Sequence, residues 1–333
     1  MNMQTRTAAL ATARPAAAIM ASLSAAALGI AVLGLAATAP ARAAPASSVP
    51  PLVDAAWLRA HLHDRGQVIL EVYDTATQRP AYEAGHIPGA VFTGFLNDGW
   101  RVPRDGIPGM LPPPEQIAGV IGHFGIGNAT RVIIVPAGRA RGDFNAAARV
   151  FWTLRMEGAD NASILNGGDR AWFADPADPV ARGNVPLRPA VFVPHPTTEY
   201  LATMPMVRAT LDSHAAQLVD ARPPAQFEGR VKAPVDARAG TLPGARNLPF
   251  SAVLTADGEG VRPMPELAQA LHRAGVERGA PSITFCNTGH FASTDWFVLR
   301  EVLANPRVRL YDGSMSEWSR NPALPMVPGH SAF

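Results

Sequence analysis

Cysteine is almost absent from this sequence, because the 333 residues include one, Cys286. A single cysteine cannot form a disulfide within the chain. The nine histidines show no paired spacing with cysteine or with carboxylates, and no glycine-rich nucleotide loop follows an expected strand. The sequence therefore argues against a disulfide framework and a metal site, and we expect no cofactor.

Long apolar runs are also missing, with one exception at the N-terminus. Arg6 and Arg14 precede an alanine-rich apolar run at 16–39, and small residues follow it up to Ala43. This layout is typical of a secretory signal peptide. We expect residues 1–43 to be removed and the mature protein to be periplasmic or secreted, without stable membrane association. The run is long enough that an uncleaved membrane anchor stays an alternative.

An excess of basic charge is lacking once residues 1–43 are set aside. The whole chain has a formal net charge of +2, and that segment contains three arginines and no acid, which leaves −1 for the remainder. No basic stripe and no alternation of basic and aromatic residues occurs. Nucleic acid is therefore a poor candidate partner.

Short apolar segments that read as strands alternate with segments that read as helices. The expected strands are 68–73, 131–135, 163–165, 217–220, 282–285 and 308–311. The expected helices are 52–58, 115–124, 145–156, 266–274 and about 294–303. This alternation predicts an α/β fold with a mostly parallel sheet covered by helices on both faces. Function is expected at the carboxyl ends of the strands.

The second half of the chain repeats the first. Asp74 and Asn166 are 92 residues apart, as are Asp220 and Asp312, and a glycine with a tryptophan five residues later then follows in each half. Matching intervals between matching residues indicate duplicated domains. The boundaries we expect are a signal peptide at 1–43, a linker at 44–51, a first domain at 52–175, a connector at 176–198, a second domain at 199–327 and a tail at 328–333.

The single cysteine follows the expected strand 282–285 and precedes a short loop with Gly289. Backbone N–H groups converge where a strand, a loop and a helix meet, and the helix N-terminus adds partial positive charge. Such surroundings lower the pKa of a thiol and favour the nucleophilic thiolate. An unpaired thiol in an exported protein is also a liability unless it has a use. We therefore interpret Cys286 as reactive rather than as a small buried hydrophobic residue.

Three separated motifs resemble the rhodaneses. The segments 83–90 (EAGHIPGA) and 310–318 (LYDGSMSEW) resemble the two flanking signatures of that family. The segment 286–289 (CNTG) stands where the family has its active-site loop. The resemblance covers about 52–327 and is to the tandem two-domain sulfurtransferases, here in an exported bacterial-type form. It implies two tandem rhodanese-like domains, and the first has no nucleophile because its matching strand runs into Pro136.

The resemblance implies a sulfurtransferase whose site lies in the cleft between the domains. Cys286 would accept a sulfane sulfur from a small anionic donor, thiosulfate or 3-mercaptopyruvate. The resulting persulfide would then pass the sulfur to a thiophilic acceptor, which is cyanide, a thiol or a protein cysteine. The loop whose amides would surround the sulfur consists of Asn287, Thr288, Gly289, His290 and Phe291.

An anionic donor calls for a guanidinium near the sulfur. Arg222 matches an Asp-x-Arg element of the family, and Arg230 is the second candidate for substrate binding. Each can also be a fold-stabilising or solvated charge. The donor-binding arginine of the family usually stands just before an aromatic residue, where this chain has Gln226.

Further departures from the family pattern leave the donor open. In the mercaptopyruvate branch a hydroxyl two residues after the cysteine is linked to a histidine that precedes Met-Leu-Pro. Thr288 supplies the hydroxyl, but Gly109 stands in place of the histidine, so we expect no such relay. Thiosulfate-type loops usually carry basic residues after the cysteine, whereas Asn287 and Thr288 are neutral. His290 either titrates near neutral pH and aids an incoming group or is an exposed loop residue without a role.

Two other classes of function compete with the sulfurtransferase. A phosphatase of the same fold needs an arginine six residues after the cysteine, where this chain has Ala292. The other alternative is a non-catalytic rhodanese-like binding or sulfur-carrier module, in which Cys286 is unused in catalysis and the cleft docks a protein partner.

Overall fold

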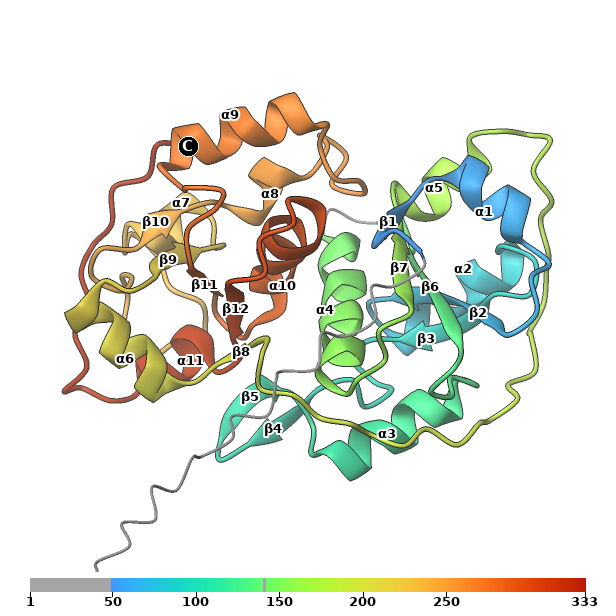
Figure 1. Ribbon diagram of the computed structural model, residues 1–333, viewed down its shortest axis with the longest axis horizontal. Helices are drawn as coiled ribbons and strands as arrows, with labels where there is room; N and C mark the ends of the chain where they lie inside the picture. The colour runs from blue at the N-terminus through green and yellow to red at the C-terminus, as the bar shows by residue number, and fades with distance from the viewer. Residues whose placement is uncertain (1–48, 140–141) are drawn as a thin grey trace, which may run out of the picture. The chain divides into compact units, whose positions relative to one another are not determined.

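The computed structural model describes residues 49–139 and 142–333 (Figure 1). The signal peptide predicted at 1–43 and most of the predicted linker lie outside the described residues. Within the described part of the chain, no helix combines the length and the apolar character that crossing a membrane requires.

The first half of the chain forms a parallel sheet with the strand order β1-β7-β6-β2-β3 and a separate antiparallel hairpin, β4–β5. Its elements are β1 (Leu52–Val53), α1 (Ala55–His61), β2 (Gln67–Tyr73), the short 3-10 helix η1 (Ala76–Gln78), α2 (Arg79–Ala84), β3 (Val91–Gly94), β4 (Val102–Arg104), β5 (Ile107–Met110), α3 (Pro114–His123), β6 (Arg131–Pro136), α4 (Asp143–Met156), β7 (Ala162–Leu165) and α5 (Gly168–Phe173).

The second half forms a parallel sheet with the order β10-β9-β11-β12-β8. Its elements are β8 (Leu201–Ala202), α6 (Met204–Ser213), β9 (Gln217–Asp220), α7 (Pro224–Phe227), β10 (Arg246–Asn247), α8 (Phe250–Val253), α9 (Met264–Ala274), β11 (Ser282–Phe285), α10 (His290–Phe297), the π-helix η2 (Val298–Val302), β12 (Val308–Tyr311) and α11 (Ser314–Trp318).

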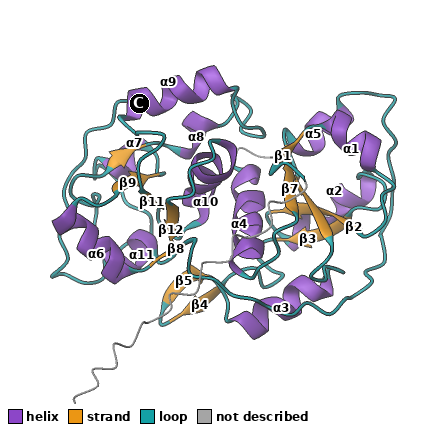
Figure 2. Ribbon diagram, viewed as in Figure 1, coloured by secondary structure: helices purple, strands orange, loops and turns teal. Residues whose placement is uncertain are grey.

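The two sheets have the same topology. Each strand of one half has a counterpart in the other half at the same place in the sheet and in the same chain order. The matching orders are β3-β2-β6-β7-β1 and β10-β9-β11-β12-β8. Figure 2 shows the strands of each half enclosed by helices. The predicted α/β fold of two tandem domains, each with a parallel sheet between helices, is therefore confirmed.

Alternating side chains of the central strands enter cores on both faces of the sheet, as a strand buried on both sides requires. In β6, Ile133 and Val135 pack in the core that includes α1 and α5. Val132 and Ile134 pack in the core on the α3 and α4 face. This arrangement explains why the buried strands read as continuous apolar runs in the sequence.

The core on the α4 face continues into the second half through α10. The rings of Phe151 on α4 and Phe297 on α10 lie 4.9 Å apart, edge to face. The hydroxyl of Thr294 donates to the side-chain oxygen of Asn145 at 2.6 Å, inside the same contact. These two helices therefore give the halves a common core.

Two sequence-based expectations need correction in the first half. The helix predicted at 52–58 is instead the edge strand β1 followed by α1, because Asp54 caps the helix by accepting the Trp57 N–H at 2.7 Å. The predicted equivalence of Asp74 with Asp220 is also wrong. Glu71 pairs with Phe92 in the sheet as Asp220 pairs with Asn247, so Glu71 holds the matching position.

The helix after Cys286 begins earlier than its sequence indicates. We expected a start near Thr294, but α10 begins at His290, directly after Gly289, whose φ of 69° turns the chain into the helix. The N–H groups of the first turn therefore belong to the loop around the cysteine. The start of α10 thus fixes the environment of the sulfur.

Candidate active site

Cys286 follows the last residue of β11, at the carboxyl edge of the second sheet. Phe285 pairs with Asp220, and in the first half Val135 pairs with the equivalent Glu71. The residue after Val135 is Pro136, which therefore occupies the register position of Cys286. The first sheet presents no nucleophile at the same place, as the sequence predicted.

Ser314 holds the backbone of the loop that follows Cys286. Its hydroxyl oxygen accepts the N–H groups of Cys286 and Gly289, each at 3.1 Å, and its proton is donated to the carbonyl of Tyr311 at 2.7 Å. The N–H of Met315 donates to the Cys286 carbonyl at 3.0 Å. Ser314 stands within the recognised 310–318 motif, but sequence reasoning did not assign it a role.

The sulfur of Cys286 lies inside a ring of backbone donors. The N–H groups of Ala292, Thr288 and Phe291 point to it. Gly289 lacks a side chain where a Cβ would clash with the Arg149 guanidinium and would lie 3.0 Å from the carbonyl oxygen of Asp312. Of the five loop residues whose amides were expected around the sulfur, Thr288 and Phe291 supply donors, and Ala292, one residue beyond the predicted loop, supplies a third.

The same sulfur is almost fully enclosed, with 1% of the cysteine exposed. Burial raises the pKa of the Cys286 thiol, the three N–H donors lower it, and the Asp220 carboxylate raises it. The net shift is upward, whereas we expected a lowered pKa. The correction has a simple cause, because the cost of removing a charged sulfur from water exceeds what the backbone donors return in this closed conformation.

Arg222 is buried and bound to its neighbours. Its guanidinium donates to both carboxylate oxygens of Asp220 at 2.6 to 3.1 Å and to the Gly240 carbonyl at 2.9 Å. A third contact, to Asp236, measures 3.6 Å. Burial lowers the pKa of Arg222, but the Asp220 carboxylate and its hydrogen bonds outweigh burial and raise it overall. These contacts describe a fold-stabilising arginine, and its role in substrate binding stays a prediction.

Arg230 points into solvent, with 65% of its side chain exposed, and pairs with Glu228 at 2.6 Å. Exposed pairs of this kind contribute about 0–1 kcal/mol. The structure therefore does not gather Arg222 and Arg230 into one anion-binding group, and donor binding by Arg230 also stays a prediction.

Asn287 and Gln226, two residues that depart from the family pattern, are in contact. The side-chain amide of Asn287 donates to the side-chain oxygen of Gln226 at 2.9 Å. Gln226 stands where the resemblance led us to look for an arginine, and Asn287 stands where it led us to look for a basic loop residue. Both side chains are uncharged, so this pair offers an anion no cation.

His290 lies in an aromatic environment beside the loop. Its ring is 5.1 Å from that of Phe95 and 5.7 Å from that of Phe291. Burial, together with the positive charges of Arg101 and Arg149, lowers the pKa of His290 to about 3. Neither alternative for His290 fits, because the lowered pKa leaves the imidazole neutral near pH 7 and the residue is half-buried rather than exposed.

Arg149 of α4 connects the first half to the surroundings of the Cys286 loop. It is buried, forms an ion pair with Asp312 and donates to the Gly109 carbonyl at 3.3 Å. Asp312 also accepts the Leu111 N–H at 2.8 Å. The sequence does not reveal this contact, because it joins residues 163 positions apart, and the acidic residue of the 310–318 motif was the one available signal.

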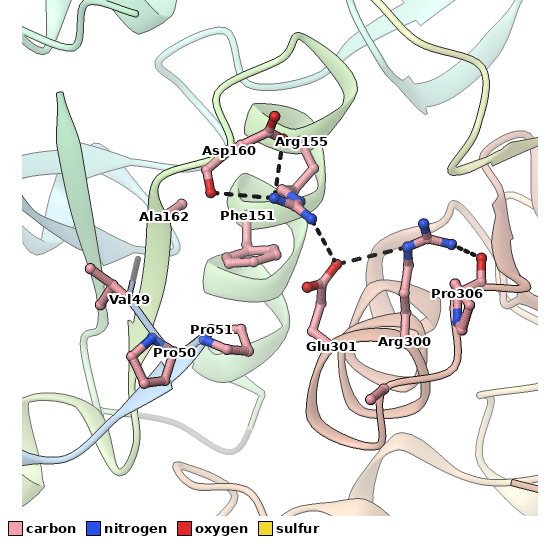
Figure 3. Close-up of a pocket in the computed structure, with 11 residues that line it drawn as sticks. Val49, Pro50, Pro51, Phe151, Arg155, Asp160, Ala162, Arg300, Glu301 and Pro306 are labelled. Carbon is pink, nitrogen blue, oxygen red and sulfur yellow. Dashed lines mark hydrogen bonds and ion pairs between the residues drawn. The ribbon is translucent and has the colours of Figure 1, made fainter. Parts of the chain in front are cut away.

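A separate cavity of about 670 Å³ lies where residues near β1 approach α4 and η2. Figure 3 shows Arg155 between Asp160 and Glu301, with Arg300 on the other side of Glu301. The Arg155 ion pairs measure 3.1 Å to Asp160 and 3.6 Å to Glu301. None of the lining residues belongs to the Cys286 loop, and their charges pair with one another, so we assign this cavity no catalytic role.

The chain matches the family model of the Rhodanese-like domain twice, at residues 54–175 and 203–321. It is 32% identical over 286 residues to the 3-mercaptopyruvate sulfurtransferase of Escherichia coli K12, covering 83% of this chain and 97% of that one. It is 31% identical over 285 residues to a Synechococcus elongatus protein with the provisional name thiosulfate sulfurtransferase, covering 83% and 85%.

The fold is similar to a solved structure as well. The crystal structure of SseA from Escherichia coli, described as a 3-mercaptopyruvate sulfotransferase with the rhodanese fold, matches with a TM-score of 0.68 and 29% identity. The match covers 80% of this chain and 99% of that one. With two matching domains, a common fold and relatives of this kind, the chain belongs to the rhodanese family and is a sulfurtransferase.

Proposed function

We propose that this sulfurtransferase carries sulfane sulfur as a persulfide on Cys286. The donor is a small anion, thiosulfate or 3-mercaptopyruvate, and the acceptor is cyanide, a thiol or a protein cysteine. The observation that carries the proposal is the ring of N–H groups from Thr288, Phe291 and Ala292 around one sulfur. An anionic outer sulfur needs such donors, because preorganised N–H dipoles stabilise charge without reorganisation.

In the first half-reaction the Cys286 thiolate attacks the terminal sulfur of the donor. A sulfur–sulfur bond to Cys286 forms as the donor's bond to that sulfur breaks. With thiosulfate the leaving group is sulfite. With 3-mercaptopyruvate it is pyruvate, which forms when the carbon that held the sulfur takes up a proton. In the second half-reaction the acceptor attacks the outer sulfur and the Cys286 thiolate is restored. This is a covalent ping-pong sequence.

Deprotonation of the thiol precedes the first step. Because burial raises the pKa of Cys286 in the closed conformation, the thiolate forms more readily when the loop is hydrated or when more positive charge is close by. We therefore expect the rate of persulfide formation to rise with pH through the neutral and mildly alkaline range.

Intact-mass measurement tests the proposal. The purified protein is incubated with thiosulfate or with 3-mercaptopyruvate, and one added sulfur is expected on the wild type and none on Cys286→Ser. Cyanide or a thiol should then remove the added mass. A wild-type protein that stays unmodified with both donors would overturn the proposal and favour the alternative, a binding module that docks a protein partner.

We also propose that the protein is exported and that residues 1–43 are a signal peptide, which makes the mature protein periplasmic or secreted. The support is the order of Arg6, Arg14, the apolar run and the small residues before Ala44. Mass determination of the protein from a bacterial host's periplasm should give an N-terminus near Ala44. A retained Met1 in the membrane fraction would instead indicate an anchor.

A further inference from the structure

We propose that Arg101, which the non-catalytic half supplies, binds the anionic group of the sulfur donor, and that Gly109 provides the space for it. The inference rests on the proposed sulfur transfer at Cys286 and adds a specificity-determining residue to it. The donor class that follows is a small sulfur compound that carries a carboxylate or a sulfonate-like oxyanion.

The position of Arg101 follows from its contacts with the hairpin. A Cβ on Gly109 would lie 3.1 Å from the Arg101 guanidinium carbon and 3.3 Å from the Cβ of Thr288. Arg101 therefore meets Thr288, which stands two residues after Cys286, at the bare face of Gly109. The Gly109 φ of 75° adds strain to any side chain there, so glycine keeps this space for the guanidinium.

The donors of Arg101 are available to a ligand. Among the residues that the structure describes, Arg101 makes no hydrogen bond or ion pair, and its ring contact is with Phe95, whose centroid lies 5.6 Å from the guanidinium carbon. Arg222 and Arg149, by contrast, are engaged by Asp220 and Asp312. Arg101 is therefore the guanidinium beside this loop whose N–H groups can still receive an oxyanion.

The electrostatic setting favours an incoming anion. Burial and the nearby Arg149 lower the pKa of Arg101, whereas the charges of Cys286, Asp312 and Asp74 act in the opposite direction. A partly buried cation without a hydrogen-bonded counter-ion carries an uncompensated desolvation cost. A carboxylate or sulfonate that accepts two parallel N–H bonds from the guanidinium would remove that cost.

Three polar side chains that the second half places in or beside the loop supply no positive charge. Gln226 and Asn287 are paired through their amides, and His290 is neutral at the pH of catalysis because its pKa is lowered to about 3. The charge that recognises the donor thus comes from the opposite half. Such an arrangement makes donor binding depend on the contact between the halves.

The test measures donor binding separately from chemistry. In a Cys286→Ser background, calorimetric titration with thiosulfate and with 3-mercaptopyruvate should show dissociation constants at least tenfold higher after Arg101→Gln. In the catalytic background, Arg101→Gln should raise the KM for the donor at least tenfold and leave the KM for the acceptor unchanged. The donor with the larger change is the one that the site selects.

Two variants serve as controls for this test. Arg101→Lys keeps the charge but loses the paired N–H groups, so it should fall between wild type and Arg101→Gln even if the glutamine variant is poorly folded. Arg104→Gln removes a neighbouring hairpin guanidinium that donates to the Leu111 carbonyl at 3.2 Å, and it should leave the donor KM unchanged.

Unchanged donor affinity in Arg101→Gln would overturn the inference while leaving persulfide formation on Cys286 intact. A wild-type protein that takes up no sulfur would instead overturn the proposed function. The two failures are thus distinguishable in one set of proteins.

Discussion

The hydroxyl of Ser314 holds the backbone of the loop that follows Cys286. The residue is fully buried and its φ is 48°, a left-handed conformation that is uncommon outside glycine and asparagine. Its oxygen accepts the N–H of Cys286, just before the loop, and the N–H of Gly289, in the middle of it. The loop therefore keeps its shape through a residue outside the loop.

Replacing this hydroxyl should loosen the loop. Ser314→Ala leaves two buried N–H groups without an acceptor, which costs about 1–3 kcal/mol of folding stability. Because the same N–H groups place the sulfur, kcat should fall by about 10- to 100-fold. Urea unfolding and sulfur-transfer kinetics check both effects. In the matched control Ser316→Ala, which loses a donor to the Gly313 carbonyl, kcat should stay near the wild-type value; an equal loss in both variants would contradict the assignment.

His290 makes the stability of the protein depend on pH in a defined direction. Its folded pKa of about 3 lies below its ordinary value of 6.5, so the unfolded chain binds the proton more readily. The contribution of His290 to stability is therefore fully present above pH 6.5 and is lost as the pH falls toward 3.

The variant His290→Phe should lose this dependence. Urea unfolding at pH 7 and pH 4.5 should show a smaller difference in unfolding free energy for His290→Phe than for the wild type. The exposed His63, changed to phenylalanine, is the control and should retain the wild-type difference. Equal differences for wild type and His290→Phe would show that the imidazole is solvated.

At the scale of elements, helix α10 contains a buried carboxylate that lacks a described partner. Asp295 is fully buried, and neither of its oxygens makes a hydrogen bond among the described residues. Burial and the nearby Asp220 raise its pKa well above the ordinary value. A neutral Asp295 therefore contributes folding stability at a pH below the pKa that this carboxyl has in the unfolded chain. That contribution is lost as the pH rises through the higher pKa of Asp295 in the folded protein.

Asp295→Asn should therefore stabilise the protein at neutral pH, by about 1–3 kcal/mol, because an amide avoids the cost of burying a charge. The gain should shrink at pH 4.5, where the carboxyl of the wild type is protonated. Thermal and urea unfolding at both pH values measure it. Asp212, whose side chain is 74% exposed on α6, gives the comparison variant, Asp212→Asn, and a similar gain there would contradict the prediction.

Most strands and the position of Cys286 at the end of one of them could be predicted from the sequence, because buried parallel strands read as apolar runs. The early start of α10 could not, since Phe291 and Ala292 carry no capping signal and the loop contacts of Gly289 fix that start. Arg101 and Arg149 were missed for another reason. Their roles depend on contacts with Thr288 and Asp312, and no local pattern encodes a contact between residues so far apart in the chain.

At the scale of the whole molecule, the contact between α4 and α10 makes the two halves of the described chain one folding unit. The core that includes Phe151 and Phe297 has members from both sheets. Residues that share a core unfold together, because exposing one face exposes the other. The duplicated topology therefore does not imply two independent stabilities.

Calorimetry should accordingly show one cooperative transition for residues 44–333, with calorimetric and van't Hoff enthalpies in agreement. Phe151→Ala should lower the stability of the whole by about 3–5 kcal/mol and keep a single transition. Phe92→Ala, in a core cluster confined to the first half, should also shift one transition. Two separated transitions in the wild type would refute the coupling.

The nearly complete enclosure of Cys286 also bears on timing. Because Cys286 is 1% exposed, the persulfide proposed on it would be out of reach of freely diffusing oxidants and thiols between turnovers. Transfer of the sulfur to an acceptor would then require the residues around the loop to move apart. Motions of this kind limit the turnover rate of many enzymes. Under the proposed function, the molecules that can gain access to Cys286 would determine where the sulfur is delivered.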